Sequence, residues 1–181
     1  YHRHAEWKHV GRLLPWALGG IAAGLLVGKA IDDETFKALI AVCVLGGLAV
    51  MVWRERQQDP QVPRSLAFAA VMGLAGGFAT MIGNAAGPIM ALYLLSMRLP
   101  RFAYIGTAAW FFTIVNLVKV PLHIFDWGTI SLRTFTLNLA LLPAIAVGAF
   151  IGVRLIKVLP ERPFRITIMV LTAAAAIKLL W

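Results

Sequence analysis

The chain has 181 residues, of which 60% are hydrophobic and 14% are charged, and its formal net charge is +9. Because a soluble domain carries about 25% charged residues, this composition excludes an ordinary water-soluble domain and favours a protein embedded in a lipid bilayer. The basic residues do not form a patch interleaved with aromatic residues, so nucleic-acid binding is not expected. The composition predicts an all-α integral membrane protein whose positive charges lie in its loops.

Seven apolar runs follow one another along the chain, and six of them are long enough to cross a bilayer, which takes about 20 residues. The fourth run is too short to cross at about 1.5 Å per residue. We expect about six transmembrane helices and one half-length helix in a single transmembrane domain, residues 1–181. The runs are Leu13–Ala30, Phe36–Trp53, Leu66–Ile82, Pro88–Met97, Phe102–Val118, Phe135–Leu155 and Phe164–Trp181.

The short run follows the segment Gly83-Asn84-Ala85-Ala86-Gly87-Pro88, which interrupts an apolar stretch. Proline removes a backbone donor and clashes with the preceding helical turn, and glycine destabilises a helix. Residues 66–97 therefore form either one long helix broken near its middle or a helix followed by a re-entrant half-helix that starts at Pro88. Either arrangement frees backbone N–H groups that need partners in a dry environment.

Two parts of the chain match at an offset of 128 residues. Leu13-Leu14-Pro15 reappears as Leu141-Leu142-Pro143, and two glycines four residues apart follow each copy without a gap. We expect residues 1–60 to be the end of a first repeat and residues 64–181 to be a complete second repeat. The rest of the first repeat would then precede this sequence. The glycine pairs are Gly20 with Gly24, and Gly148 with Gly152.

The loop charges predict how the chain crosses the membrane, because cytoplasmic loops are enriched in Lys and Arg. Four stretches hold twelve of the 17 basic residues, and two other connectors hold four. Placing the rich stretches on the cytoplasmic side makes the two repeats inverted and turns the chain back at the break. Inverted repeats with broken helices are a recurring plan of secondary transporters. The rich stretches are 1–12, 54–64, 98–101 and 154–165, and the poor connectors are 29–37 and 119–133.

All eight acidic residues lie in loops or at the ends of the predicted spans. Carboxylates inside a membrane usually mark proton relays or cation sites, and acid–base catalysis also needs paired carboxylates. No spacing of His, Cys, Asp or Glu suits a metal ion. We therefore expect no catalytic residues, no metal and no cofactor, and a substrate that is an anion or a polar neutral molecule.

The interrupted segment is the strongest candidate for a substrate site. A helix that starts at Pro88 has a partial positive charge at its first turn, and exposed N–H groups around Gly83 and Gly87 suit an anion. Asn84 adds a side-chain donor. The alternative is a helix kink packed by small residues.

Asn116 and Lys119 lie three residues apart on one helical face, in a run that we expect Pro121 to end. Lys119 is positioned either to neutralise a bound anion or to extend its side chain to the membrane interface. An amide inside a membrane span needs a polar partner, which makes Asn116 a second candidate for the site.

These features resemble the sulfite exporter TauE/SafE family. The resembling stretch runs from Gly73 to Pro88 and continues through residues 91–95. Where the family pattern ends in Gly-Gly-Pro, this chain has Ala86-Gly87-Pro88, so one glycine is replaced. The resemblance implies transport of sulfite or a sulfur-containing organic anion across a bacterial-type plasma membrane. Gly106-Thr107, Asn116, Lys119, Pro121 and the two Leu-Leu-Pro segments match as well.

We therefore expect a secondary transporter that moves a small anion by alternating access, with the substrate near Asn84 and Asn116. The chain offers no intramembrane carboxylate to carry a coupled proton, so such a proton would travel on the substrate. The alternative is a non-transporting membrane scaffold or assembly partner, which needs packed helices but no hydrated cavity. The sequence leaves the substrate, the coupling ion, the direction of transport and the oligomeric state open.

Overall fold

The computed structural model describes residues 4–28, 30, 32–56 and 65–178, and within these ranges it contains seven α-helices. Each predicted apolar run overlaps one of these helices, so the predicted all-α architecture is confirmed. The predicted junction between the repeats, residues 60–64, lies outside the described residues. The helices are α1 (Trp7–Val27), α2 (Asp33–Arg56), α3 (Leu66–Gly83), α4 (Ala86–Ser96), α5 (Arg101–Phe125), α6 (Leu132–Val158) and α7 (Glu161–Lys178).

Four of the described helices are long and apolar enough to cross a membrane, namely α1, α3, α5 and α6, and α4 is a shorter apolar helix. The chain is therefore a multi-pass α-helical membrane protein. The expected number of full spans was about six. In the described part α7 falls outside this group, because its 18 residues include Glu161, Arg162, Arg165 and Lys178. The helix α2 is also not counted among the four spans. Several of its side chains lie outside the described residues.

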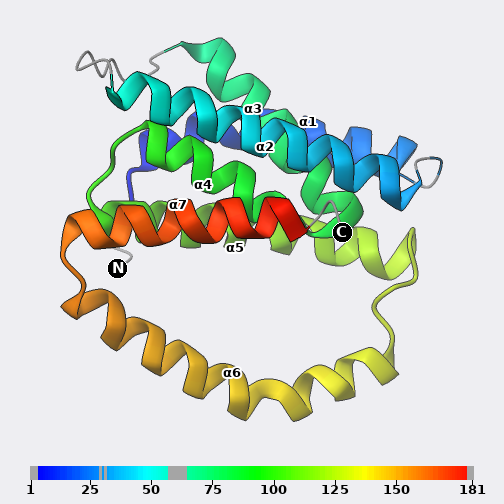
Figure 1. Ribbon diagram of the computed structural model, residues 1–181. Helices are drawn as coiled ribbons and strands as arrows, with labels where there is room; N and C mark the ends of the chain where they lie inside the picture. Colours follow the sequence, from blue (N-terminus) through cyan, green and yellow to red (C-terminus); the bar gives the residue numbers. More distant parts are fainter. Residues whose placement is uncertain (1–3, 29, 31, 57–64, 179–181) are drawn as a thin grey trace.

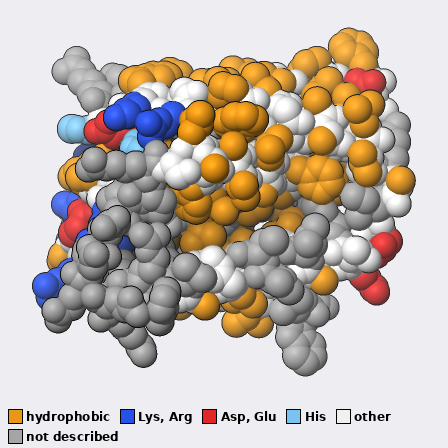
Figure 2. Space-filling model, turned by 90° about the horizontal axis from the view of Figure 1, so that it is seen from above, with side chains coloured by type: hydrophobic (Ala, Val, Ile, Leu, Met, Phe, Trp, Pro, Cys, Tyr) orange, Lys and Arg blue, Asp and Glu red, His pale blue; other side chains and the backbone are white. Residues whose placement is uncertain are grey.

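The helices form one bundle from which α6 stands apart (Figure 1). Within the bundle α1 packs along α3, and α7 packs against α2 and α4. The start of α1, the end of α2 and the α4–α5 and α6–α7 turns lie together at one end, here called the basic end (Figure 1). The α1–α2 and α5–α6 connections lie at the opposite end. On the face shown in Figure 2, Lys and Arg side chains gather at the basic end, and hydrophobic side chains cover much of the surface between the ends.

This arrangement agrees with the topology expected from the loop charges, because the described parts of the four basic-rich stretches share one end. In addition, α1 and α6 run in opposite directions along the bundle (Figure 1). Opposite directions are what two inverted copies require. The duplication itself stays a prediction from the sequence.

Glycines bring the backbones of α1 and α3 close together. A Cβ atom added at Gly20 would lie 2.8 Å from the backbone nitrogen of Phe78, and one added at Gly73 would lie 2.8 Å from the carbonyl oxygen of Leu13. A Cβ at Gly77 would overlap the backbone of Ala17. Small residues allow this close approach, which is a main source of helix association where lipid replaces water. The α1–α3 contact fixes the position of α3, and α3 leads into the candidate site.

We predict that Gly77→Ala lowers the free energy of unfolding by about 1–3 kcal/mol, because the new methyl group must push two backbones apart. Gly46→Ala on α2 is the matched control, since a Cβ there meets nothing within 4 Å. Alanine favours a helix over glycine by about 1 kcal/mol, so the control is expected to be neutral or stabilising. Unfolding of both variants in detergent checks this, and equal stability of the two would contradict the close packing of α1 on α3.

Candidate functional site

The chain reverses direction at Asn84, between α3 and α4. The Asn84 backbone is left-handed, with φ 51° and ψ 30°, a conformation that asparagine adopts more readily than most residues. The N–H of Asn84 donates to the carbonyl of Thr80 at 3.2 Å, and the N–H of Ala85 donates to the carbonyl of Ala79 at 3.1 Å. These bonds close the C-terminus of α3. Of the two arrangements expected from the sequence, the helix followed by a re-entrant half-helix is the one observed.

The half-helix α4 begins at Ala86, two residues earlier than the predicted start at Pro88. Pro88 fits within the first turn because the N–H groups there have no intrahelical partner. The expectation of freed N–H groups is wrong for Asn84 and Ala85, which are bonded to α3. It still applies to the first turn of α4, which has no side-chain cap. With 11 residues, α4 extends about 16 Å from the basic end, roughly half of a hydrocarbon core about 30 Å thick.

Lys119 reaches this break from α5. Its Nζ atom donates to Asn84 Oδ1 at 2.9 Å and to Thr80 Oγ1 at 3.0 Å. The Thr80 hydroxyl also lies 3.4 Å from Asn84 Oδ1. Only 5% of the Lys119 surface is exposed, so its side chain is buried in the bundle. An ammonium group has three donors, and these two contacts leave one N–H for another molecule.

The site is electropositive. No carboxylate pairs with Lys119 among the residues that the structure describes, and the partial positive charge at the start of α4 lies two residues from Asn84. Because Asn84 Oδ1 already accepts from Lys119 and Thr80, the amide NH₂ group is the part of Asn84 left to bind a ligand. Gly83, Asn84 and Gly87 are exposed, and a Cβ at Gly87 would meet nothing within 4 Å. An ammonium, an amide and a helix N-terminus therefore lie close together at the break, and all three attract anions.

Comparison with known proteins agrees with this architecture. The family model described as "Sulfite exporter TauE/SafE" matches residues 1–179. The chain belongs to this family. No solved structure matches it.

Curated proteins that are similar to this chain are named as probable membrane transporters. "Probable inner membrane transporter protein TsaS" of Comamonas testosteroni is 29% identical over 182 residues, covering 98% of this chain and 73% of TsaS. "Probable membrane transporter protein MamO" of Paramagnetospirillum magneticum is 26% identical over 216 residues, covering 97% of this chain and 34% of MamO. MamO of Magnetospirillum gryphiswaldense is 24% identical with the same coverage. The chain thus spans about a third of the length of the MamO relatives.

The structure brings together two of the site residues expected of this TauE/SafE chain, Asn84 and Lys119. Gly83, Gly87 and Pro88 flank them at the break, with Pro88 half-buried. Asn116 is placed differently, because it lies one turn before Lys119 on the exposed surface of α5. Asn116 is not among the contacts of Asn84 and Lys119. Its role in the site stays a prediction.

The expectation that Pro121 ends its helix is wrong. α5 continues to Phe125, with Pro121 inside it. Transmembrane helices tolerate proline because neighbouring groups satisfy the freed carbonyl. The helix therefore continues beyond Lys119 for more than a turn, which holds the lysine in a regular helical backbone.

Thr80 is the contact residue that the sequence interpretation overlooked. It lies four residues before Asn84, about one helical turn earlier in the chain, and its hydroxyl contacts the Asn84 side chain. A hydroxyl one turn before the break was therefore a usable signal, although threonine is common in membrane helices, where it often bonds its own backbone.

Trp127 carries a buried indole nitrogen without a hydrogen-bond partner in the described part of the chain. The end of its ring lies 3.2 Å from the position of a Cβ on Gly28, a position that also contacts the side chain of Ile82. Ile82 is two residues before Asn84, so Trp127 packs beside the end of α3.

Proposed function

We propose that this chain forms part of a secondary transporter that moves a small anion across the plasma membrane by alternating access. The observation that carries the proposal is the buried Lys119 ammonium, held at a re-entrant break by two uncharged side chains. A buried cation without a counter-ion is unfavourable by several kcal/mol, and a bound anion compensates for it. Membership of the TauE/SafE family and the transporter names of the relatives support the proposal.

The break offers a defined way to hold the anion. Thr80 and Asn84 solvate the ammonium while the site is empty, and they keep two of its three donors occupied. An arriving oxyanion accepts from the remaining Lys119 N–H, from the Asn84 amide and from the first turn of α4. Charge-assisted hydrogen bonds of this kind contribute about 1.5–3 kcal/mol each. The anion and Lys119 then form a neutral pair in apolar surroundings, which favours passage through the membrane core.

Sulfite and sulfur-containing organic anions are the first substrates to test, because the family is described as sulfite exporters. Their several oxygens match the converging donors at the break. A coupled proton would travel on the substrate, since the site contains no carboxylate among its described contacts. We propose the bacterial inner membrane as the location, in line with the name of TsaS.

The proposal is tested by anion uptake into proteoliposomes that contain the full-length protein. Thr80→Val removes one of the two acceptors that position Lys119 Nζ, at nearly constant side-chain shape. We expect the apparent affinity for the anion to fall about 2–10-fold because the ammonium is held less precisely. Thr113→Val is the matched control, because the Thr113 hydroxyl bonds only to the backbone carbonyl of Ala109 on the exposed side of α5. Folded wild-type protein that transports none of the anions would favour the scaffold alternative.

A further inference from the structure

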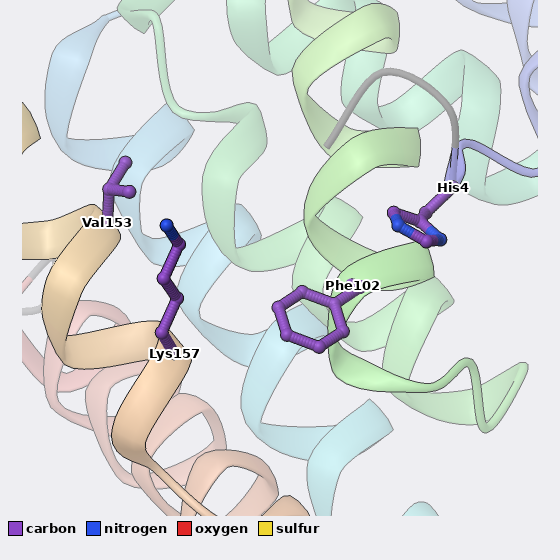
Figure 3. Close-up of a pocket in the computed structure, with 4 residues that line it drawn as sticks. All are labelled: His4, Phe102, Val153 and Lys157. Atoms are coloured by element: carbon purple, nitrogen blue, oxygen red, sulfur yellow. The ribbon is translucent and has the colours of Figure 1, made fainter.

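A partly open cavity of about 490 Å³ lies at the basic end of the molecule, between the end of α6 and the start of α5. Val153 and Lys157 line it from α6, and Figure 3 shows the Lys157 side chain extending away from the α6 backbone. Phe102 and His4 line it from the opposite side (Figure 3). Ligand pockets in proteins have volumes of about 300–1,000 Å³, so this cavity is large enough for a small ligand or a head group.

The cavity lies at the depth of the lipid head groups. With 27 residues, α6 is about 40 Å long, whereas the hydrocarbon core is about 30 Å thick. Lys157 is in the last turn of α6, which places it at the membrane surface, on the side that the loop charges assign to the cytoplasm. Toward the membrane core from it, Ile151 and Leu155 of α6 are exposed. A ligand held by Lys157 therefore has polar surroundings on one side and apolar side chains on the other.

The surroundings of the cavity are positively charged. The α4–α5 turn at residues 98–101 and the α6–α7 turn at residues 154–165 contain six basic residues and one acidic residue, Glu161. Glu161 Oε2 accepts from the backbone N–H of Arg101 at 3.2 Å, so the carboxylate sits at the N-terminus of α5, where the helix dipole compensates its charge. An anionic group is the complement of these turns.

Two further basic side chains are held beside the cavity by the Phe102 ring. The Arg101 guanidinium lies 4.7 Å from the centre of this ring, a cation–π contact. The His4 ring packs against the same ring, with centroids 5.8 Å apart. Phe102 thus fixes Arg101 and His4 near the wall that faces Lys157, and the donors of all three basic side chains suit the oxygens of a phosphate.

We propose that this cavity binds the head group of an anionic phospholipid from the cytoplasmic leaflet. The lipid phosphate accepts from Lys157 Nζ, and the acyl chains lie along the exposed apolar side chains of α6. A free phosphate shares the first contact and makes no use of the second. Basic pockets between membrane helices on the cytoplasmic side bind anionic head groups in this way. The proposal does not rest on anion transport by the break.

The test titrates phosphatidylglycerol into the full-length protein in an uncharged detergent and follows the thermal midpoint. We expect the apparent affinity for this lipid to fall about 5-fold in Lys157→Gln, as for the loss of one basic contact at a membrane surface. Lys178→Gln is the matched control, because it removes the same charge at the opposite end of α7. Both lysines are exposed, so neither change disturbs the packing.

Two comparisons in the same titration identify the ligand. Phosphatidylcholine with the same acyl chains is expected to raise the midpoint less than phosphatidylglycerol in the wild-type protein. Inorganic phosphate is expected to leave the midpoint unchanged at equal ionic strength. An equal response to phosphatidylglycerol in the wild type and in Lys157→Gln would overturn the proposal. A rise with inorganic phosphate equal to the rise with the lipid would assign the cavity to a soluble anion and would overturn it as well.

Photo-crosslinking in nanodiscs with equal amounts of the two lipids tests the position of the site. A photoreactive residue in place of Val153, which lines the cavity, is expected to label phosphatidylglycerol about 5-fold more than phosphatidylcholine. The same residue in place of Val147, exposed near the middle of α6, is expected to label the two lipids equally. Equal labelling from both positions would contradict a head-group site in the cavity.

Discussion

Asn84→Asp is expected to abolish anion transport while the protein stays folded. The substitution keeps the shape of the side chain and places a carboxylate where Asn84 Oδ1 now lies, 2.9 Å from Lys119 Nζ. The ammonium then has a permanent counter-ion, and the added negative charge repels a substrate anion. Two charges 4 Å apart near a protein surface interact by about 4 kcal/mol, so we expect anion affinity to fall about 100-fold or more. Uptake by proteoliposomes and the thermal midpoint of the same preparation measure the two effects.

Asn84→Gly is the control for this substitution. Glycine adopts the left-handed backbone at φ 51° without strain, so the turn is kept, and the charge of Lys119 is unchanged. The amide donor is lost, which is expected to weaken anion affinity only about 2–10-fold. Transport by Asn84→Asp at the wild-type rate would show that the Lys119 charge does not act on the substrate.

Lys119→Met is expected to reduce kcat/KM for the anion about 10–100-fold, which corresponds to the loss of one charge-assisted contact. Methionine fills a similar volume, and the Thr80 hydroxyl, 3.4 Å from Asn84 Oδ1, still has a partner. Replacing a buried charge by an apolar side chain is often neutral or stabilising. The expected signature is therefore reduced transport with an unchanged or higher thermal midpoint.

Lys119→Arg separates charge from shape in the same assay. It keeps the positive charge but presents a planar fork in place of a compact ammonium, so we expect partial transport. A different outcome, in which Lys119→Met unfolds and Lys119→Arg restores only stability, would make Lys119 a structural residue of the α3–α5 contact.

The helices were largely predictable because a long apolar run is a strong signal in a membrane protein. The residues at which the helices begin and end were harder to predict. Pro121 lies inside α5, and α4 begins before Pro88, since proline is tolerated in a first helical turn and within membrane helices. The reversal at the break was one of two expected arrangements, and the left-handed backbone of Asn84 selects it.

The residues of the candidate site were partly predictable, but the contact between them was not. Asn84 and Lys119 stand out as polar residues in apolar runs, but their contact joins positions 35 residues apart, which spacing alone does not reveal. Asn116 was expected beside Lys119 because they share one helical face. The buried stripe of α5 instead repeats every fourth residue, and Asn116 falls just outside it. In a membrane helix the buried and lipid-facing sides are both apolar, so hydropathy does not distinguish them. The stripe consists of Thr107, Phe111, Val115 and Lys119.

Anion-dependent thermal stability of the full-length protein tests most directly whether the break binds an anion. A ligand that binds only the folded state stabilises it by about 2.7 kcal/mol at 100 times its Kd. We predict that sulfite, or another transported anion, raises the midpoint of the wild-type protein in a saturable way and leaves that of Asn84→Asp unchanged at equal ionic strength. The same rise in both proteins would contradict a site formed by Lys119 and Asn84.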